Sequence, residues 1–195
     1  MSEIIFKTNF MPYVSRAGDK LEHALKNFNF NPENLVCADF GSSTGGFVDC
    51  LLKFGAKTVY AVETGYGVLD WKLRNDKRVM VLERKNAIHI ELPEKADLIT
   101  IDTGWTKLEK VMSNALKNLK PDGKIIALMK PHYEASPKKL KKGRLPQEFI
   151  QETLDAVKTK LNGLGAEVLA ETESPILGEK GKNKEYLLCL KKSRV

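Results

Sequence analysis

A glycine-rich turn stands between an apolar strand and an apolar helix in the stretch DFGSSTGGF, residues 39–47. Its spacing is Gly41, three residues, then Gly45 and Gly46, which differs from the G-x-G-x-x-G of a dinucleotide loop. The stretch also lacks the lysine that a triphosphate loop needs. The carboxylate of Asp39 suits an ammonium group, and the N–H groups of the paired glycines suit a carboxylate. The turn therefore predicts a site for the two charged ends of an amino acid such as methionine.

Two polar residues, one ending the next predicted strand and one following the strand after it, extend this site toward a nucleoside. Glu63 ends the stretch TVYAVE and is placed to accept hydrogen bonds from both hydroxyls of a ribose, and Asn86 is placed to face an adenine. Together these features predict S-adenosylmethionine as the cofactor. The alternative is a plain strand-to-helix turn in which the acids cap the backbone. The predicted cofactor-binding residues are Asp39, Gly41, Ser42, Ser43, Thr44, Gly45, Gly46, Phe47, Glu63, Asn86 and Asp102.

The elements that position these residues alternate between strand and helix. Near-continuous apolar strands are predicted at LVCADFG, TVYAVE, RVMVLE, ADLITID and KIIALMK, with helices between them. The first helix, SRAGDKLEHALKNF, has Ser15 available as its cap, and the helix LEKVMSNALKNLKPDG is closed by Pro121 and Gly123. A long helix is predicted from about Gln147 to Leu161.

The last two strands, AEVLAET and EYLLCLKK, have no helix between them and are expected to pair antiparallel. Strands that are apolar throughout and separated by helices are typical of a parallel sheet covered on both faces. We therefore predict an α/β fold, namely the Rossmann-like fold of S-adenosylmethionine-dependent methyltransferases. Its sheet is expected to be seven-stranded and mostly parallel with an antiparallel last strand, and the turn at residues 39–46 falls where ligands of such sheets bind.

The composition sets limits on the class of protein. A chain of 195 residues with 42% hydrophobic residues is expected to form one domain, and the net charge of +7 indicates an anionic partner, with a merely solvated lysine surface as the alternative. We expect a cytoplasmic protein, because the sequence shows neither a membrane span nor the plan of a signal peptide. Cys37, Cys50 and Cys189 lie in apolar patterns and are expected to be buried thiols, not metal ligands or disulfides.

Six stretches resemble, in order and at similar separations, the TlyA or hemolysin-A-like branch of the FtsJ-type ribosomal RNA 2'-O-methyltransferases. They are YVSRAGDKLEHAL, ADFGSSTGGFVDCLL, VETGYGVLDWKLRND, LERKN, IALMKPHYEA and SPILGEKGKNKEYLL. On this resemblance, residues 15–195 are expected to be the FtsJ-like methyltransferase domain and residues 1–14 an N-terminal extension. Members of this family normally carry an S4-like RNA-binding domain before the YVSR stretch, where about a dozen residues stand here. That difference leaves RNA affinity to the surface of the catalytic domain.

The resemblance implies a Lys-Asp-Lys-Glu catalytic set, and all four residues are present as Lys20, Asp102, Lys130 and Glu185. A lysine can take the proton of a ribose 2'-hydroxyl once burial or a nearby cation lowers its pKa. Two converging lysines would lower each other's pKa, the two acids would oppose this, and Lys130 is the candidate base. The methyl transfer is an in-line displacement that depends on positioning, so no metal site is predicted.

The chain departs from the family pattern at two places near this set. After Asp102 it continues TGW, ending at Trp105, where the family usually has VSF. KPHYE replaces the more usual KPQFE and puts His132 near the site. We interpret His132 as a loop residue without a catalytic duty, because geometry has to precede pKa in naming a base.

RNA is the partner that the resemblance implies, and clustered cations are candidates for phosphate contacts. A solvated loop without function is the alternative for the lysine-rich stretch. Two alternatives remain for the whole chain: a methyltransferase of a small molecule, and a non-catalytic RNA-binding or membrane-active protein of the hemolysin type. The candidate RNA-binding residues are Arg16, Lys138, Lys139, Lys141, Lys142, Arg144, Lys180, Lys182 and Lys184.

Overall fold

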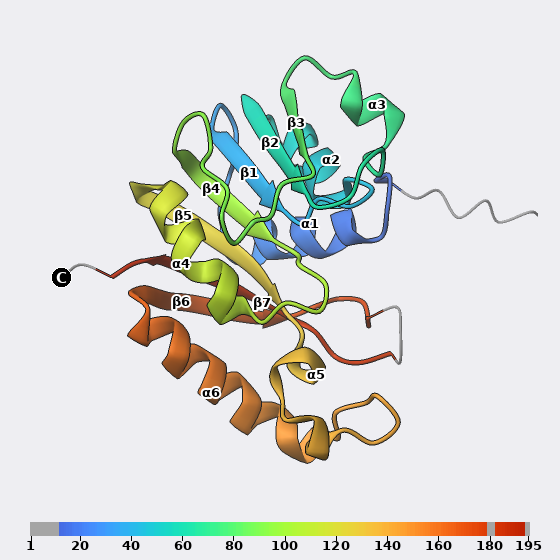
Figure 1. The fold of residues 1–195 in the computed structure, drawn as a ribbon, viewed down its shortest axis with the longest axis vertical. Coiled ribbons are helices and arrows are strands. Elements are labelled where there is room, and N and C mark those ends of the chain that lie inside the picture. The colour runs from blue at the N-terminus through green and yellow to red at the C-terminus, as the bar shows by residue number, and fades with distance from the viewer. Residues whose placement is uncertain (1–11, 179–181, 194–195) are drawn as a thin grey trace, which may run out of the picture.

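The computed structural model describes residues 12–178 and 182–193 and has a seven-stranded sheet at its centre (Figure 1). Across the sheet the strand order is β3-β2-β1-β4-β5-β7-β6. Strand β7 runs antiparallel to both of its neighbours, and the remaining pairs are parallel. The predicted sheet is therefore confirmed. The strands are β1 (Val36–Phe40), β2 (Thr58–Glu63), β3 (Val79–Glu83), β4 (Ala96–Ile101), β5 (Leu119–Met129), β6 (Ala166–Glu173) and β7 (Tyr186–Lys192).

Helices cover both faces of the sheet (Figure 1). One face is covered by α1 (Ala17–Asn27), α2 (Gly46–Lys53) and the short α3 (Trp71–Arg74), and the other by α4 (Leu108–Asn118) and α6 (Ile150–Gly163). The one-turn helix α5 (Pro131–Glu134) follows β5 directly. Two 3-10 turns, η1 (Pro137–Lys139) and η2 (Gln147–Phe149), lie in the loop before α6, so the helix predicted from Gln147 starts with a 3-10 turn.

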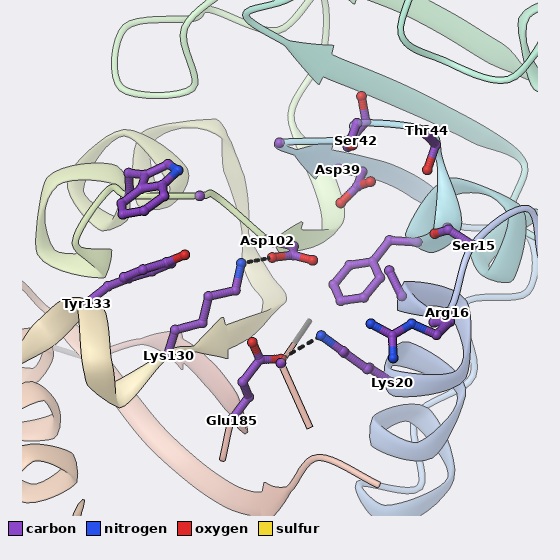
Figure 2. Close-up of a pocket in the computed structure, with 18 of the residues that line it drawn as sticks. Ser15, Arg16, Lys20, Asp39, Ser42, Thr44, Asp102, Lys130, Tyr133 and Glu185 are labelled. Atoms are coloured by element: carbon purple, nitrogen blue, oxygen red, sulfur yellow. Dashed lines mark hydrogen bonds and ion pairs between the residues drawn. The ribbon is translucent and has the colours of Figure 1, made fainter. Parts of the chain in front are cut away.

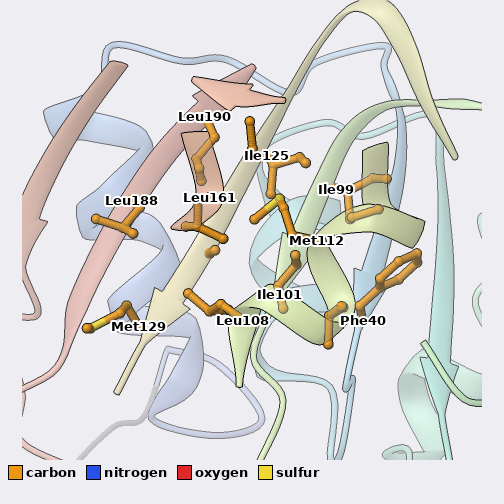
Figure 3. Packing of buried hydrophobic residues seen from close by; sticks show 14 of the residues in the cluster. Phe40, Ile99, Ile101, Leu108, Met112, Ile125, Met129, Leu161, Leu188 and Leu190 are labelled. Carbon is orange, nitrogen blue, oxygen red and sulfur yellow. The ribbon is translucent and has the colours of Figure 1, made fainter. Parts of the chain in front are cut away.

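The central strand β4 shows why its sequence is mostly apolar. Ile99 and Ile101 pack with Met112 of α4 and with other buried side chains on one face (Figure 3), while Leu98 packs with Leu51 of α2 on the other. Burying one such side chain contributes about 1.5–3 kcal/mol. Because helices cover both faces, every position of this strand except Asp97 is buried, and the alternation of a half-exposed strand is lost.

The junction of α4 and β5 differs from the sequence prediction. The helix ends at Asn118 and the strand begins at Leu119, so Pro121 and Gly123 lie inside β5 and do not close a helix. A Cβ at Gly123 would lie 2.9 Å from the carbonyl oxygen of Asp97, beside an irregularity in the β4–β5 register. Glycine is needed there because two strands approach closely. In the sequence alone, such a glycine looks the same as one that ends a helix.

The N-terminal cap was also predicted wrongly. Arg16 occupies the N-cap position of α1 without a side-chain hydrogen bond, and Ser15 instead accepts a hydrogen bond on its carbonyl oxygen from the Gly18 N–H at 3.1 Å. Residues 1–11 of the expected extension lie outside the described residues. Tyr13, also within that extension, is buried in the core and donates a hydrogen bond to Glu22 at 2.9 Å.

The three cysteines are buried free thiols, as predicted. Among the described residues there is no group of three or more His, Cys, Asp or Glu side chains placed to hold a metal ion. Within the same residues, no helix combines the length and the apolar surface that crossing a bilayer requires.

Candidate active site

A cavity of about 790 Å³ opens at the carboxyl edge of the sheet, beside the point where the strand order reverses between β1 and β4 (Figure 2). Its walls come from the turn after β1, the start of α1, the residues that follow β4 and β5, and the residue before β7. This is where open α/β sheets bind their ligands. The glycine-rich turn therefore lies where the sequence predicted.

The four predicted catalytic side chains point into this cavity (Figure 2). Asp102 and Lys130 follow the neighbouring parallel strands β4 and β5, so both lie at the same edge. Strand β7 is antiparallel to β5 with Tyr186 opposite Met129, which brings Glu185 beside Lys130. Lys20 reaches the cavity from α1.

The four side chains form two ion pairs. Lys130 Nζ lies 2.5 Å from Asp102 Oδ1, and Lys20 Nζ lies 2.5 Å from Glu185 Oε2. All four are largely buried, which makes each charge costly unless its partner is present. Each acid therefore holds one lysine in a fixed place.

The acids decide the protonation state of Lys130. Burial lowers the pKa of its ammonium group, but the charge of Asp102 and its hydrogen bond, with smaller contributions from Glu185 and Tyr133, outweigh burial and raise the pKa above its usual value. The predicted opposition between burial and the acids is present, and the acids prevail. Lys130 is a cation in this state of the protein.

Asp39 is a further carboxyl group that lines the cavity, and it is buried. It is 1% exposed and accepts a hydrogen bond from Thr100 Oγ1 at 2.6 Å. Burial raises its pKa to about 8, the bond from Thr100 works against this, and the nearby charges of Asp102 and Glu63 add to the rise. The structure thus holds a carboxyl group in the cavity that an added cation would ionise.

The turn after β1 needs glycine at one position for a specific reason. Gly41 has φ +88°, and a Cβ there would lie 2.6 Å from the carbonyl oxygen of Asp102. Next to it, the buried Ser42 Oγ has no hydrogen-bond partner among the described residues. An unpaired polar atom, a buried acid and a backbone that leaves room for a ligand fit the amino-acid end of the predicted cofactor.

Most of the predicted cofactor-binding residues surround one of two adjoining cavities. Gly45 is the exception: it lines neither of them, has φ +99°, and a Cβ there would meet the side chains of Leu69 and Leu73. It serves the packing of α3 against the turn. The residues that line the large cavity are Asp39, Gly41, Ser42, Ser43, Thr44, Gly46, Phe47 and Asp102.

A second cavity of about 340 Å³ adjoins the first and contains Glu63 and Asn86. The two cavities share Gly41, Ser43, Asp102 and Gly104. Burial raises the pKa of Glu63, but the N–H groups of Gly65 and Ser43, each at 2.9 Å, and the Thr64 hydroxyl outweigh it, so the pKa is lowered. A fixed, ionised carboxylate is what two ribose hydroxyls need as their acceptor.

Two aromatic residues at the large cavity were not among the predicted site residues. Trp105 is 78% exposed, has φ +59°, and stacks on Tyr133 with ring centroids 4.9 Å apart. Lys130 Nζ lies 5.9 Å from the centroid of the Tyr133 ring. The signal in the sequence was their position, because Trp105 stands three residues after Asp102 and Tyr133 three residues after Lys130.

His132 lines the same cavity, and the centroid of its ring lies 4.1 Å from the centroid of the Tyr133 ring. Burial, assisted by the charge of Lys130, lowers its pKa to about 4, so the imidazole is neutral near pH 7. With so low a pKa, His132 is a weak base near pH 7. The interpretation of His132 as non-catalytic stays a prediction.

The predicted RNA-binding cations fall into different groups. Lys138, Lys182 and Arg16 are exposed, and so are the cations of a tight turn at residues 141–144, here called the basic turn. Lys139 instead pairs with Glu152 and lies over the Phe149 ring, and Lys184 pairs with Glu173. Lys180 lies outside the described residues. The cations of the basic turn are Lys141, Lys142 and Arg144.

Known proteins share both the sequence pattern and the fold of this chain. The family described as "FtsJ-like methyltransferase" matches residues 13–192. Hemolysin A of Brachyspira hyodysenteriae is 40% identical over 90% of this chain and 75% of its own length. The Mycobacterium tuberculosis 16S/23S rRNA (cytidine-2'-O)-methyltransferase TlyA is 37% identical over 92% of this chain and 68% of its own length. A solved structure of a hemolysin-type protein from Streptococcus thermophilus has a TM-score of 0.91 at 36% identity, covering 96% of this chain and 70% of that one.

Proposed function

Because this chain belongs to the family of FtsJ-like methyltransferases, we propose that it methylates a ribose 2'-hydroxyl of ribosomal RNA. The observation that carries the proposal is the meeting of Lys20, Asp102, Lys130 and Glu185 in one cavity. The activity for which the mycobacterial relative is named supports a ribosomal substrate. We place the activity in the cytoplasm, where that substrate occurs.

S-adenosylmethionine is the cofactor and supplies the methyl group. In our proposal Asp39 binds its ammonium group, and the first N–H groups of α2 with Ser42 Oγ bind its carboxylate. Glu63 accepts hydrogen bonds from the ribose, and Asn86 lies on the adenine side. The shared wall at Asp102 lies where these two parts of the site meet.

The acceptor side of the cavity suits a nucleotide of RNA. Lys130 is the proposed base, and only its neutral amine can take the proton of the 2'-hydroxyl. Asp102 keeps this amine protonated in most protein molecules, so only the fraction with a neutral Lys130 can react. The exposed ring of Trp105 at the mouth offers an aromatic face for a base, and the basic turn offers cations for phosphates.

We expect cofactor binding to depend on pH through Asp39. At pH 7 its carboxyl group is mostly protonated, because its pKa is raised to about 8 by burial. Binding an ammonium group favours the ionised form, so the affinity should rise by up to about tenfold per pH unit below pH 8 and then level off, with release of a proton. Calorimetry in buffers of different ionisation enthalpy measures both quantities, and Asp39→Asn should bind weakly with little pH dependence. An affinity that does not change between pH 6 and 8 would contradict this role.

The proposed function is tested by incubating the protein with radiolabelled cofactor and ribosomal RNA, both naked and in isolated subunits. Label in RNA that maps to a 2'-O-methyl group supports the proposal. Cofactor binding without label in any RNA would overturn it and return the small-molecule alternative to consideration.

The basic turn provides a second prediction. Replacing Lys141 and Lys142 by alanine should weaken RNA binding and reduce the salt slope of log K by up to about 0.7–0.9 for each phosphate that the protein no longer neutralises. The matched control is Lys57→Ala with Lys117→Ala, two exposed lysines next to the amino ends of β2 and β5, at the opposite edge of the sheet. It removes the same charge and should leave the slope almost unchanged. Equal effects of the two pairs, measured by filter binding at several salt concentrations, would mean that only net charge matters.

A further inference from the structure

Asn183 is a buried polar residue that holds the basic turn in place. It is 6% exposed, and its Oδ1 accepts a hydrogen bond from the Leu145 N–H at 3.1 Å. Its Nδ2 donates to the Gly143 carbonyl oxygen, also at 3.1 Å. The oxygen and the nitrogen of the side-chain amide therefore both bond the backbone at the basic turn. These bonds fix the backbone from which the exposed cations extend.

The backbone of the same residue holds the segment that carries Glu185. The Asn183 carbonyl oxygen accepts a hydrogen bond from the Gly178 N–H at 2.9 Å. Gly178 in turn lies against the catalytic acid, since a Cβ there would be 2.6 Å from Glu185 Oε1. Glu185 follows Asn183 by two residues and pairs with Lys20.

We propose that Asn183 is a positioning residue that couples the basic turn to Glu185, so that RNA held at the turn sets the Glu185–Lys20 pair in its catalytic place. This rests on the proposed RNA substrate. The residue touches neither cavity directly, and its effect passes through the hydrogen bonds above. Because hydrogen bonds are directional and one of these two is buried, a displacement of the turn is transmitted to the chain two residues before Glu185.

The test is a double-mutant cycle between Asn183→Leu and the pair Lys141→Ala with Lys142→Ala. The rate of a single turnover is measured at saturating RNA and cofactor, together with the dissociation constants of both. Asn183→Leu should lower the saturating rate at least about tenfold while cofactor affinity stays within about twofold. The lysine pair should lower the saturating rate when Asn183 is present and have no further effect on it in the Asn183→Leu variant, because the coupling is already absent there.

Asn118→Leu is the matched control. Asn118 is equally buried at 6% exposure and bonds the Leu92 N–H and the Ile90 carbonyl oxygen, away from both cavities. It should lower the melting temperature and leave the saturating rate unchanged. Should Asn183→Leu fail to fold, Asn183→Asp keeps the acceptor for Leu145 and enters the same cycle.

Additive effects of the two changes on the saturating rate, or an equal loss of rate in Asn118→Leu, would overturn the proposal. Wild-type protein that methylates no RNA would instead overturn the proposed function, so the two failures are distinguishable.

Discussion

Replacing Lys130 by methionine should reduce the rate of methyl transfer by about a thousandfold, the scale on which a positioned general base contributes. Methionine keeps the unbranched stem of the side chain, one heavy atom shorter, and removes the amine that pairs with Asp102. Cofactor affinity should change little, since the proposed contacts to the amino-acid and ribose groups are made by other residues. The measurement is a single-turnover rate at saturating cofactor, with calorimetry for binding.

Lys130→Arg separates the role of a base from that of a charge. Arginine pairs with Asp102 as lysine does but stays protonated in proteins, so we expect this variant to be as slow as Lys130→Met. In the wild type, the raised pKa of Lys130 means that the neutral fraction grows about tenfold per pH unit through the neutral and alkaline range. The rate at saturating cofactor should rise accordingly from pH 7 to pH 9. An active arginine variant, or a rate that levels off below pH 8, would show that another group takes the proton.

Gly41→Ala should strongly weaken cofactor binding and reduce activity with it. The new Cβ would lie 2.6 Å from the carbonyl oxygen of Asp102, and the residue would be held at φ +88°, which costs roughly 1–2 kcal/mol for an L-residue. The atoms nearest the new Cβ are backbone atoms of Asp102 and Thr103, which no side-chain rotation can move away. The backbone at Asp102 therefore has to shift, and Asp102 lines both cavities. We expect at least about a hundredfold loss in cofactor affinity, equivalent to roughly 2.7 kcal/mol, measured by calorimetry.

Gly67→Ala is the matched control for backbone strain. Gly67 also has a left-handed φ, +70°, but nothing lies within 4 Å of an added Cβ. It should lower the melting temperature by about as much as strain alone predicts and keep the cofactor affinity. Equal losses of affinity in both variants would attribute the effect to strain, not to the contact with Asp102.

The sequence was sufficient to predict those parts of the site whose positions depend only on the topology of the sheet. Asp102 and Lys130 could be placed at adjacent strand ends because a parallel sheet puts all its carboxyl ends at one edge. The bounds of β2 were predicted without error, since Thr58–Glu63 is a short apolar run between turn residues. These features depend on local pattern and on general rules of sheet geometry.

What could not be predicted depends on contacts between distant segments. Gly123 resembles a helix stop, and only the approach of Asp97 shows that it belongs in a strand. Lys139 belongs to a run of cations, yet its partner Glu152 lies in the following helix. The protonation of Lys130 depends on a balance between burial and two acids, which needs their distances.

The reversed strand β7 also bears on when the enzyme becomes active during its synthesis. Lys20 and Glu185 are 165 positions apart in the chain and make one ion pair, and Glu185 enters the cavity only when β7 inserts between β5 and β6. We expect a nascent chain to form the first five strands, with the proposed cofactor site at their carboxyl ends, while the ribosome still holds β7. The contact between Lys20 and Glu185 can form only after the intervening strands are in place, so it comes late in folding. We therefore expect the growing chain to acquire cofactor binding first and catalysis last, so that truncated products capture cofactor without modifying RNA.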